Sequence, residues 1–313
     1  MMSAAAMIVA LATESAFGWP DRLYQAIGHP VTWIGRLINH MDERFNLPED
    51  SPLEKRRWGR ITLLIVVAAA ALPAALIAAI LPDGWIGLLL TGLLAAPLLA
   101  PRSMYTHVAD VAAPLKEGNL TDARVAVAKI VGRDPESLDS EGVARAAIES
   151  LAENTSDGIV APVFWGVLFG LPGIAAYKAV NTADSMIAHK SEKYIDFGRA
   201  AASLDDIANW IPSRLTALII AVVQKRPLQA LSVVFRDSQK HRSPNAGWPE
   251  AAMAGALDVR LSGPRSYPEG PSDDPYLNSE APDPTPDDID RALTVYIRAM
   301  GLFALLLFLI ALL

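Results

Sequence analysis

Two long uncharged stretches lie close together in the first third of the chain. Residues 61–81 and 84–101 contain no charged side chain, and Pro82-Asp83-Gly84 has the composition of a tight turn. A helix needs about 20 predominantly apolar residues to cross the hydrocarbon core of a bilayer. The pattern therefore predicts a helical hairpin that crosses a membrane and returns. The length of both stretches disfavours the alternative, a buried hairpin in a soluble core.

Further apolar stretches are less regular. Residues 299–313 carry no charge, which predicts a C-terminal transmembrane anchor. Residues 158–177 are also uncharged, but two prolines and four glycines interrupt them, so a broken or re-entrant helix fits as well as a clean span. Residues 207–223 are short and carry Arg214, which predicts partial burial in protein. Residues 1–12 lack a basic flank and predict an apolar first helix rather than a signal peptide.

Basic residues give an expected orientation. Four of them stand at positions 55–60, just before the first stretch, and Arg102 follows the second. Because an excess of Lys and Arg marks the cytoplasmic side of membrane helices, both ends of the hairpin are expected inside and Asp83 outside. The polar, helix-patterned residues 102–157 then form a cytoplasmic helical segment.

One segment near the C-terminus differs from the rest in composition. Residues 266–290 contain six prolines, eight acidic residues and no basic residue, which predicts a flexible acidic linker without a packed core. The expected organisation is a membrane-embedded catalytic domain at 1–265, this linker, and an anchor at 291–313. Strand signals are scarce. The expected fold is therefore all-α: a polytopic integral membrane helical bundle with broken or re-entrant helices.

Composition and charge exclude several classes of protein. Hydrophobic residues make up 52% of the chain and charged residues 19%, against about 25% charged in a typical soluble domain. The chain has no cysteine, so disulfides, thiolate metal sites and cysteine nucleophiles are excluded. The formal charge of −7 argues against a nucleic-acid partner, which would require a basic face.

The first polar cluster lies at the start of the interrupted apolar stretch. Arg145, Glu149 and Glu153 are spaced by four and share one face of a predicted helix, and Asn154 and Asp157 follow where that helix ends. A solvated ladder of ion pairs is one interpretation. The other is a site for a divalent cation or a substrate amine, because carboxylates at a membrane edge are costly without a partner.

A second cluster spaces Lys178, Asn181 and Asp184 by three, roughly along one helix face. An ammonium, an amide and a carboxylate suit magnesium and phosphate oxygens, because Mg²⁺ takes hard oxygen ligands and usually keeps substrate phosphates. A third cluster enters an apolar segment with Asp205 and Asp206, three or four residues before Asn209. A helix cap with an exposed charge is the structural alternative for this pair of acids.

A fourth cluster is basic and lies at 236–250, in a predicted loop before a helix. Arg and Lys hold phosphate, and helix N-termini bind anions, so this loop is a candidate anion cradle. The phosphate-binding and dinucleotide-binding glycine motifs are absent, as are the hydrolase nucleophile elbow and the zincin motif. The five histidines are too scattered to indicate a zinc site.

Taken together, these clusters resemble the CobD/CbiB family, the adenosylcobinamide-phosphate synthases of cobalamin biosynthesis. The similar blocks are HPV-x-W-x-G at 29–35, GRD at 132–134, RAAIESLAENTSDGIVAPVFW at 145–165, YKAVNTADSM at 177–186, FG at 197–198, LDDIANWIPSRLTA at 204–217 and HRSPNAGWPEAAMAGAL at 241–257. They follow the family order from about residue 10 to residue 262. The chain departs from the pattern at Ala183, Ala188 and Ser203, where the family has leucine, glycine and a basic residue.

The resemblance implies amide formation between a propionate carboxylate of adenosylcobyric acid and (R)-1-aminopropan-2-ol or its O-phosphate. It also implies ATP as co-substrate and Mg²⁺, most simply through an acyl phosphate. The expected catalytic residues are Glu149, Glu153, Asp157, Asp205 and Asp206. Residues expected to bind ATP or substrate phosphate are Arg133, Lys178, Arg199, Arg214, His241, Arg242, Ser243 and Asn245. The expected metal ligands are Glu153, Asn154, Asn181, Asp184, Asp205 and Asn209.

The expected partners are the corrinoid substrate, aminopropanol phosphate, ATP and the lipid bilayer. Association into a homo-oligomer, or with other late membrane enzymes of the same pathway, is also an expectation. The protein is expected in the inner cell membrane, with several spans and its active site on the cytoplasmic side. Two alternatives stay open: a Mg²⁺-dependent membrane transferase acting on a lipid or prenyl phosphate, since Asp-Asp pairs recur across classes, and a non-catalytic membrane relative.

Overall fold

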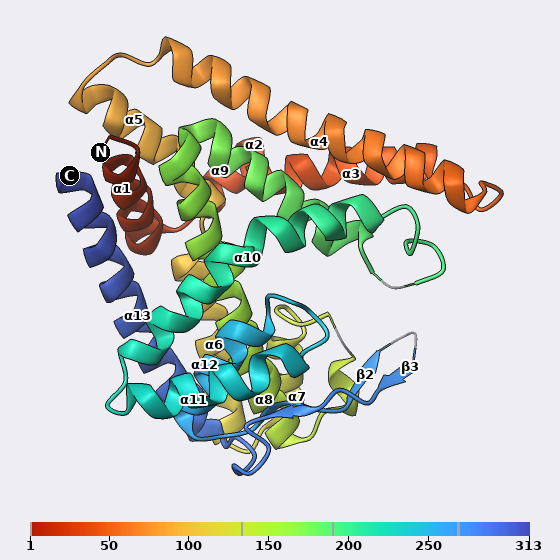
Figure 1. Ribbon diagram of the computed structural model, residues 1–313, viewed down its shortest axis with the longest axis vertical. Helices are drawn as coiled ribbons and strands as arrows, with labels where there is room; N and C mark the ends of the chain where they lie inside the picture. Colours follow the sequence, from red (N-terminus) through yellow and green to blue (C-terminus); the bar gives the residue numbers. More distant parts are fainter. Residues whose placement is uncertain (1, 133, 190, 268–269) are drawn as a thin grey trace. The chain divides into compact units, whose positions relative to one another are not determined.

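The computed structural model describes residues 2–132, 134–189, 191–267 and 270–313, and it is almost wholly helical (Figure 1). In chain order the helices are α1 (Met2–Phe17), α2 (Asp21–Ile27), α3 (Pro30–Phe45), α4 (Pro52–Ile80), α5 (Trp85–Ala95), η1 (Ala96–Leu98), α6 (Pro101–Lys116), α7 (Leu120–Val127), η2 (Pro135–Ser137), α8 (Ser140–Thr155), η3 (Ser156–Val160), α9 (Ala161–Ile187), α10 (Arg199–Val222), α11 (Pro227–Asp237), η4 (Ser238–Lys240), α12 (Gly247–Leu257) and α13 (Pro286–Leu312). Two short antiparallel pairs join β1 (Leu261–Ser262) to β4 (Tyr276–Leu277), and β2 (Arg265–Tyr267) to β3 (Gly270–Ser272). The expectation of an all-α fold is confirmed.

The chain forms two compact units, each built from separate stretches of sequence. Unit 1 comprises Met1–Ala100, Ala161–Asn209 and Leu307–Leu313, and unit 2 comprises Pro101–Val160 and Trp210–Leu306. In unit 1, α4 packs along α9, α1 packs on α5 and α9, and α3 packs on α4 and α9. In unit 2, α8 packs against α6, α7 and α12, and α11 packs on α12.

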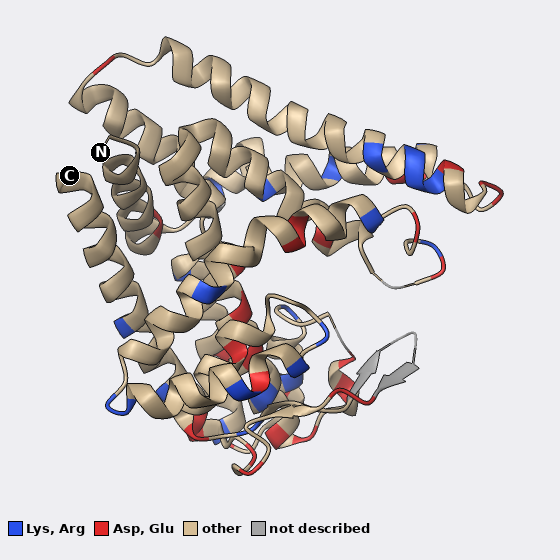
Figure 2. Cartoon of the chain, in the orientation of Figure 1, with Lys and Arg blue, Asp and Glu red and all other residues tan. Residues whose placement is uncertain are grey.

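Four helical stretches of the described chain are long and apolar enough to cross a membrane. They are Pro52–Ile80, Trp85–Lys116, Ser140–Ile187 and Pro286–Leu312, and a fifth span results if α1 and the stretch 22–45, bent by 107°, form one broken crossing. The two uncharged runs therefore fall in two membrane-length helical stretches separated by residues 81–84, and their crossing of a membrane as a hairpin stays a prediction. Figure 2 shows basic residues gathered at the start of α4, followed by a long part of that helix without charged residues. The side of the membrane on which each end lies stays a prediction.

The third membrane-length stretch is broken, as the prolines and glycines of 158–177 predict. A π-helical turn, η3, follows α8 directly. Within α9, Gly170 has φ 65° and ψ −151°, a conformation outside the helical region that residues with a side chain rarely adopt. The stretch 207–223, in contrast, falls in α10 except for its last residue, and α10 is not among the membrane-length stretches.

The acidic segment 266–290 differs from the flexible linker that its composition predicts. Its strand β4 pairs with β1, Leu277 is fully buried, and the last helix already begins at Pro286. Asp283 accepts hydrogen bonds from Arg260, the larger influence, and from Arg145, and both hold the pKa of its carboxyl below the usual range. The composition of the segment did not reveal this packing, because the counter-charges come from arginines outside the segment. The domain boundaries at 265 and 290 stay predictions.

A buried carboxylate fastens the same segment to α11. Asp237 is fully buried and accepts hydrogen bonds from Arg236 at 2.8 Å and from the backbone N–H of Asn278 at 2.7 Å, and Lys240 lies 2.7 Å away. Burial alone raises the pKa of Asp237, but these donors outweigh it and lower the pKa to about 2. Because the pKa is depressed in the folded state, the carboxylate stabilises the fold above about pH 4.

This stabilisation, ~2 kcal/mol, should disappear as the pH falls from 4 to 2, when Asp237 becomes protonated. We expect Asp237→Asn to lower the melting temperature of the detergent-solubilised protein at pH 7 and to lose that deficit progressively at low pH. Thermal unfolding followed by circular dichroism across this range is the measurement. A deficit that stays constant with pH would contradict the assignment.

Candidate functional site

The polar residues of α9 and α10 in unit 1 form one hydrogen-bonded network. Asp205, buried with 7% exposure, accepts hydrogen bonds from Asn209 Nδ2 at 2.9 Å and from Asn181 Nδ2 at 3.4 Å. The hydroxyl of Tyr177 donates to Asn209 Oδ1 at 2.8 Å. The pairs 181–205 and 177–209 place the two helices antiparallel here. The second and third sequence clusters are thus brought together, as expected.

The loop between the two helices sets their register through the FG block. Phe197 is fully buried in the core formed by α3, α4 and α9. A Cβ atom at Gly198 would overlap the carbonyl oxygen of Ile187, and one at Gly59 would overlap that of Phe197, so both positions require glycine. Close backbone contacts at the end of α9 therefore fix where α10 starts and, with it, the position of Asp205.

A second attachment holds this loop to α3. The buried carboxylate of Asp42 accepts hydrogen bonds from Lys193 Nζ at 2.6 Å, from the Tyr194 hydroxyl at 3.0 Å and from Asn46 Nδ2 at 2.8 Å. The bond to Asp42 raises the pKa of Lys193, which keeps the ammonium charged. The network at Asp205 is thus built on a hairpin held at both its helices and its loop.

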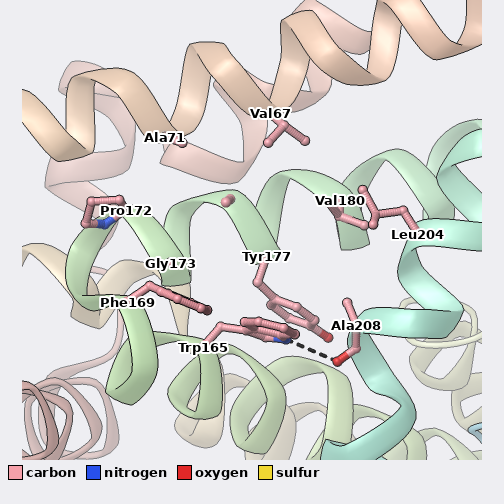
Figure 3. A pocket seen from close by; sticks show the side chains of 11 residues that line it. Val67, Ala71, Trp165, Phe169, Pro172, Gly173, Tyr177, Val180, Leu204 and Ala208 are labelled. Carbon is pink, nitrogen blue, oxygen red and sulfur yellow. Dashed lines mark hydrogen bonds between the residues drawn. The ribbon is translucent and has the colours of Figure 1, made fainter.

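An apolar cavity of about 400 Å³ adjoins the network (Figure 3). Val67 and Ala71 of α4 line one side, and the rings of Trp165, Phe169 and Tyr177 line another. Trp165 stacks on Phe169 with ring centroids 5.7 Å apart, and its indole N–H donates to the Ala208 carbonyl at 3.1 Å. Tyr177 belongs to both features, since its ring lines the cavity and its hydroxyl joins the polar network. The site can therefore receive a ligand with an apolar part beside a polar or charged one.

The fourth cluster lies in unit 2, where Arg214 braces the loop before α12. Its guanidinium lies between the rings of Trp210 and Trp248, 4.5 and 4.4 Å from their centroids. Nη1 donates to Asn245 Oδ1 at 3.1 Å and to the Trp210 carbonyl at 2.7 Å, and Ser213 also reaches Asn245. Burial lowers the pKa of Arg214. Because both faces of the Arg214 guanidinium are stacked and its Nη1 donates hydrogen bonds, the geometry favours a role in holding the loop. The expected role of Arg214 at a phosphate stays a prediction.

The other polar side chains of this loop form hydrogen bonds with the backbone of the loop itself. Ser243 Oγ accepts from the N–H groups of Asn245 at 3.3 Å and Ala246 at 3.2 Å, and His241 Nδ1 accepts from Ser243 N–H at 3.1 Å. His241 Nε2 lies 3.7 Å from the buried Glu250. Arg242 is exposed. Of the loop residues expected to bind phosphate, Arg242 is the one whose side chain the structure presents outward.

We expect Arg214→Lys to loosen this loop, because lysine keeps the charge but loses the planar group between the two indoles and its forked donors. The loss of about 1–2 kcal/mol of stacking and hydrogen bonding corresponds to roughly tenfold faster amide exchange. Hydrogen exchange of residues 241–246 measures it. The exposed Arg226→Lys change in the same unit is the matched control. Equal exchange in both variants would contradict the bracing role.

The first cluster in unit 2 holds other segments in place. Glu149, 4% exposed, accepts from the backbone N–H of Ser262 at 2.6 Å, and Arg145 forms an ion pair with Asp283. Glu153 at the end of α8 is exposed, and Asp157 lies in the π-helical turn η3. Glu149 thus has a clear structural task, and its expected catalytic role stays a prediction, as do those of Glu153 and Asp157.

The expected metal ligands fall in both units, so their convergence stays a prediction. Glu153 and Asn154 belong to unit 2, and Asn181, Asp184, Asp205 and Asn209 belong to unit 1. Within the residues that the structure describes, no three His, Asp or Glu side chains are grouped as for a metal ion. The oxygen donors of the Asp205 network still fit Mg²⁺, which is commonly held by one or two carboxylates together with substrate phosphates.

The remaining expected residues are less constrained. Arg199 is exposed at the start of α10, Asp206 and Lys178 are half-buried, and Arg133 lies outside the described residues. Sequence reasoning missed the role of Tyr177 in the network. Its position four residues before Asn181, on the same helix face, was the available signal.

Comparison with known proteins gives consistent matches. The model of the family described as CobD/Cbib protein matches residues 7–296. A "Cobalamin biosynthesis protein CobD" of Rhodobacter capsulatus is 54% identical over 313 residues, covering 100% of this chain and 99% of the relative. Proteins of the same name from Brucella suis and Rhizobium meliloti are 46% and 44% identical, each over 94% of this chain and 92% of the relative. No solved structure matches the chain. By the extent of the family match and the identity to these relatives, the chain belongs to the CobD/CbiB family.

Proposed function

We propose that this protein forms an amide bond in cobalamin biosynthesis, joining (R)-1-aminopropan-2-ol or its O-phosphate to a propionate carboxylate of adenosylcobyric acid with consumption of ATP. Family membership supports a role in cobalamin biosynthesis. The observation that carries the proposal further is the buried Asp205 network beside an apolar, aromatic cavity in unit 1. The corrinoid substrate also combines apolar ring edges with charged or polar side chains.

The chemistry balances as two transfers. The γ-phosphoryl group of ATP passes to the propionate carboxylate, which gives an acyl phosphate and ADP. The amine then attacks the acyl carbon, the C–O bond to phosphate breaks, and the amide and inorganic phosphate are released. The amine must first lose a proton from its ammonium form, and a carboxylate of the site is the group to accept it. Asp206, half-buried next to Asp205, is our candidate for that base.

Asp205, Asn181 and Asn209 are the residues that would hold Mg²⁺ on the phosphates of ATP. The ion would supply charge neutralisation at the transferred phosphoryl group. Lys178, one turn before Asn181 on α9, adds a positive charge on the same helix.

The test uses the full-length protein in detergent or lipid nanodiscs with adenosylcobyric acid, ATP and Mg²⁺. One arm contains aminopropanol O-phosphate and the other contains free aminopropanol, and mass spectrometry detects the amide product. Formation of either product, dependent on ATP, supports the proposal and identifies the acceptor. Absence of both products from folded protein contradicts it. Conversion of a prenyl or lipid phosphate without any corrinoid would instead establish a lipid-phosphate transferase.

A further inference from the structure

His29 begins helix α3 in an unusual way. Its Nδ1 accepts a hydrogen bond from Val31 N–H at 3.2 Å, and Thr32 Oγ1 in return accepts from His29 N–H at 3.2 Å. Because Nδ1 is the acceptor, the single proton of the neutral imidazole lies on Nε2. The cap therefore fixes which nitrogen of the ring is a donor.

The residues around His29 hold its ring in one orientation. Trp19 meets the imidazole edge-on at 5.1 Å, and its indole N–H donates to the Gly28 carbonyl at 3.1 Å. Trp33 donates to the Ile27 carbonyl at 2.8 Å. Gly28 has φ +76°, and a Cβ atom there would come within 3.0 Å of the Trp33 indole nitrogen. Trp19, Trp33 and Gly28 together thus fix the position of the half-buried imidazole of His29.

Capping alone does not account for a histidine here. Asn, Asp, Ser and Thr are the preferred capping residues, and any of them would satisfy the same N–H group. A position that departs from the local preference without a gain in stability is a candidate for function. Among the described residues, no protein group accepts a hydrogen bond from His29 Nε2.

Helix α3, which His29 begins, runs beside the helix that carries the candidate site. α3 packs on α9 within unit 1, and Gly35 lies against Met186 of α9. Nearer the start of both helices, Lys178 is close enough to act electrostatically on the imidazole. Lys178 lies one helical turn before Asn181, which donates to Asp205. His29 therefore lies on a third helix, near the part of α9 that carries Lys178.

We propose that His29 is a substrate-binding residue of this site, where its Nε2–H donates a hydrogen bond to a phosphate oxygen and Lys178 supplies the positive charge. This inference rests on the proposed function, because it assigns the phosphate to one of that reaction's substrates. A neutral donor of fixed direction positions the anion, whereas a flexible ammonium alone would only attract it. The phosphate belongs either to ATP or to aminopropanol O-phosphate.

The test compares His29→Asn with Thr32→Val in the full-length protein. Asparagine keeps the cap but lacks the Nε2–H donor, so stability should be unchanged while kcat/KM falls about 10- to 100-fold. Valine removes the reciprocal hydroxyl and leaves the imidazole, so stability should fall while kcat/KM of the folded protein is retained. Equilibrium binding of ADP and of aminopropanol O-phosphate to each variant gives a readout that needs no turnover.

The outcomes separate the possibilities. A rise in KM and Kd for ATP or ADP assigns the donor to the nucleotide. An effect with aminopropanol O-phosphate that vanishes with free aminopropanol assigns it to the acceptor. Equal binding and kcat/KM in His29→Asn and the unmodified protein would overturn the inference and leave His29 as a cap. If the unmodified protein binds both phosphates, and binding weakens in His29→Asn, but no amide forms, the proposed function fails while the binding role stands.

Discussion

Replacing Asp205 by asparagine is expected to lower turnover at least ~100-fold and to leave membrane insertion unchanged. The change keeps the size of the side chain and removes the charge from a position that is only 7% exposed. It also sets an amide nitrogen against the amide donors of Asn181 and Asn209, which now share a carboxylate. Both losses act on the groups that we propose hold Mg²⁺ and ATP. The amide-forming assay at saturating substrate measures the effect.

Tyr177→Phe is the matched control for this prediction. It deletes a hydrogen bond of the same network, from the Tyr177 hydroxyl to Asn209, without any change of charge. The expected loss is smaller, about tenfold or less, as for one neutral hydrogen bond. Near-normal turnover of Asp205→Asn and Asp184→Asn, at both saturating and limiting Mg²⁺, would show that these carboxylates are structural.

The second large effect is expected on folding, from Gly198→Ala. The added methyl group would overlap the carbonyl oxygen of Ile187, which belongs to the backbone and has no rotamer into which it can move. The neighbouring Phe197 is fully buried, so the loop cannot shift outward without exposing it. We expect a destabilisation above about 3 kcal/mol, seen as loss of the monodisperse detergent-solubilised protein.

Gly301→Ala in α13 is the control for the alanine change itself. No atom lies within 4 Å of a Cβ placed there, so the substitution should be neutral or stabilise the helix by up to ~1 kcal/mol. Comparison of the two melting temperatures tests the packing argument. A Gly198→Ala protein as stable as Gly301→Ala would mean that the loop does not set the register of α9 and α10.

Local signals in the sequence were sufficient for the membrane helices but not for all of their ends. The uncharged run that starts at residue 61 predicts a span, yet α4 begins at Pro52. Ser51 and Glu54 form a reciprocal capping box there, and the charged first turns continue the same helix. Hydropathy finds the part of a helix that lipid requires, whereas capping chemistry decides where the helix starts.

Contacts between residues far apart in the sequence could not be predicted from the sequence alone. The spacing of Asp205 and Asn209 on one helix is visible in the sequence, and their hydrogen bond is present. The contact of Asp205 with Asn181 on another helix depends on the close backbone packing of Gly198 against Ile187, which no periodicity reveals. The acidic segment failed as a predicted linker for the same reason, because Arg145 lies 138 residues before its partner Asp283.

That separation also constrains how the protein is made. At ~5–20 residues per second, a ribosome needs roughly 7–28 s to proceed from Arg145 to Asp283. During this interval the carboxylate that pairs with Arg145 does not yet exist, and the backbone N–H that binds Glu149 is absent until Ser262 has been added. The side chains of Arg145 and Glu149, which are largely buried in the folded protein, therefore stay hydrated or bound to a chaperone until these partners are made. Nascent chains arrested before residue 283 should be degraded by proteases, because the face of α8 that carries Arg145 still lacks its partner Asp283.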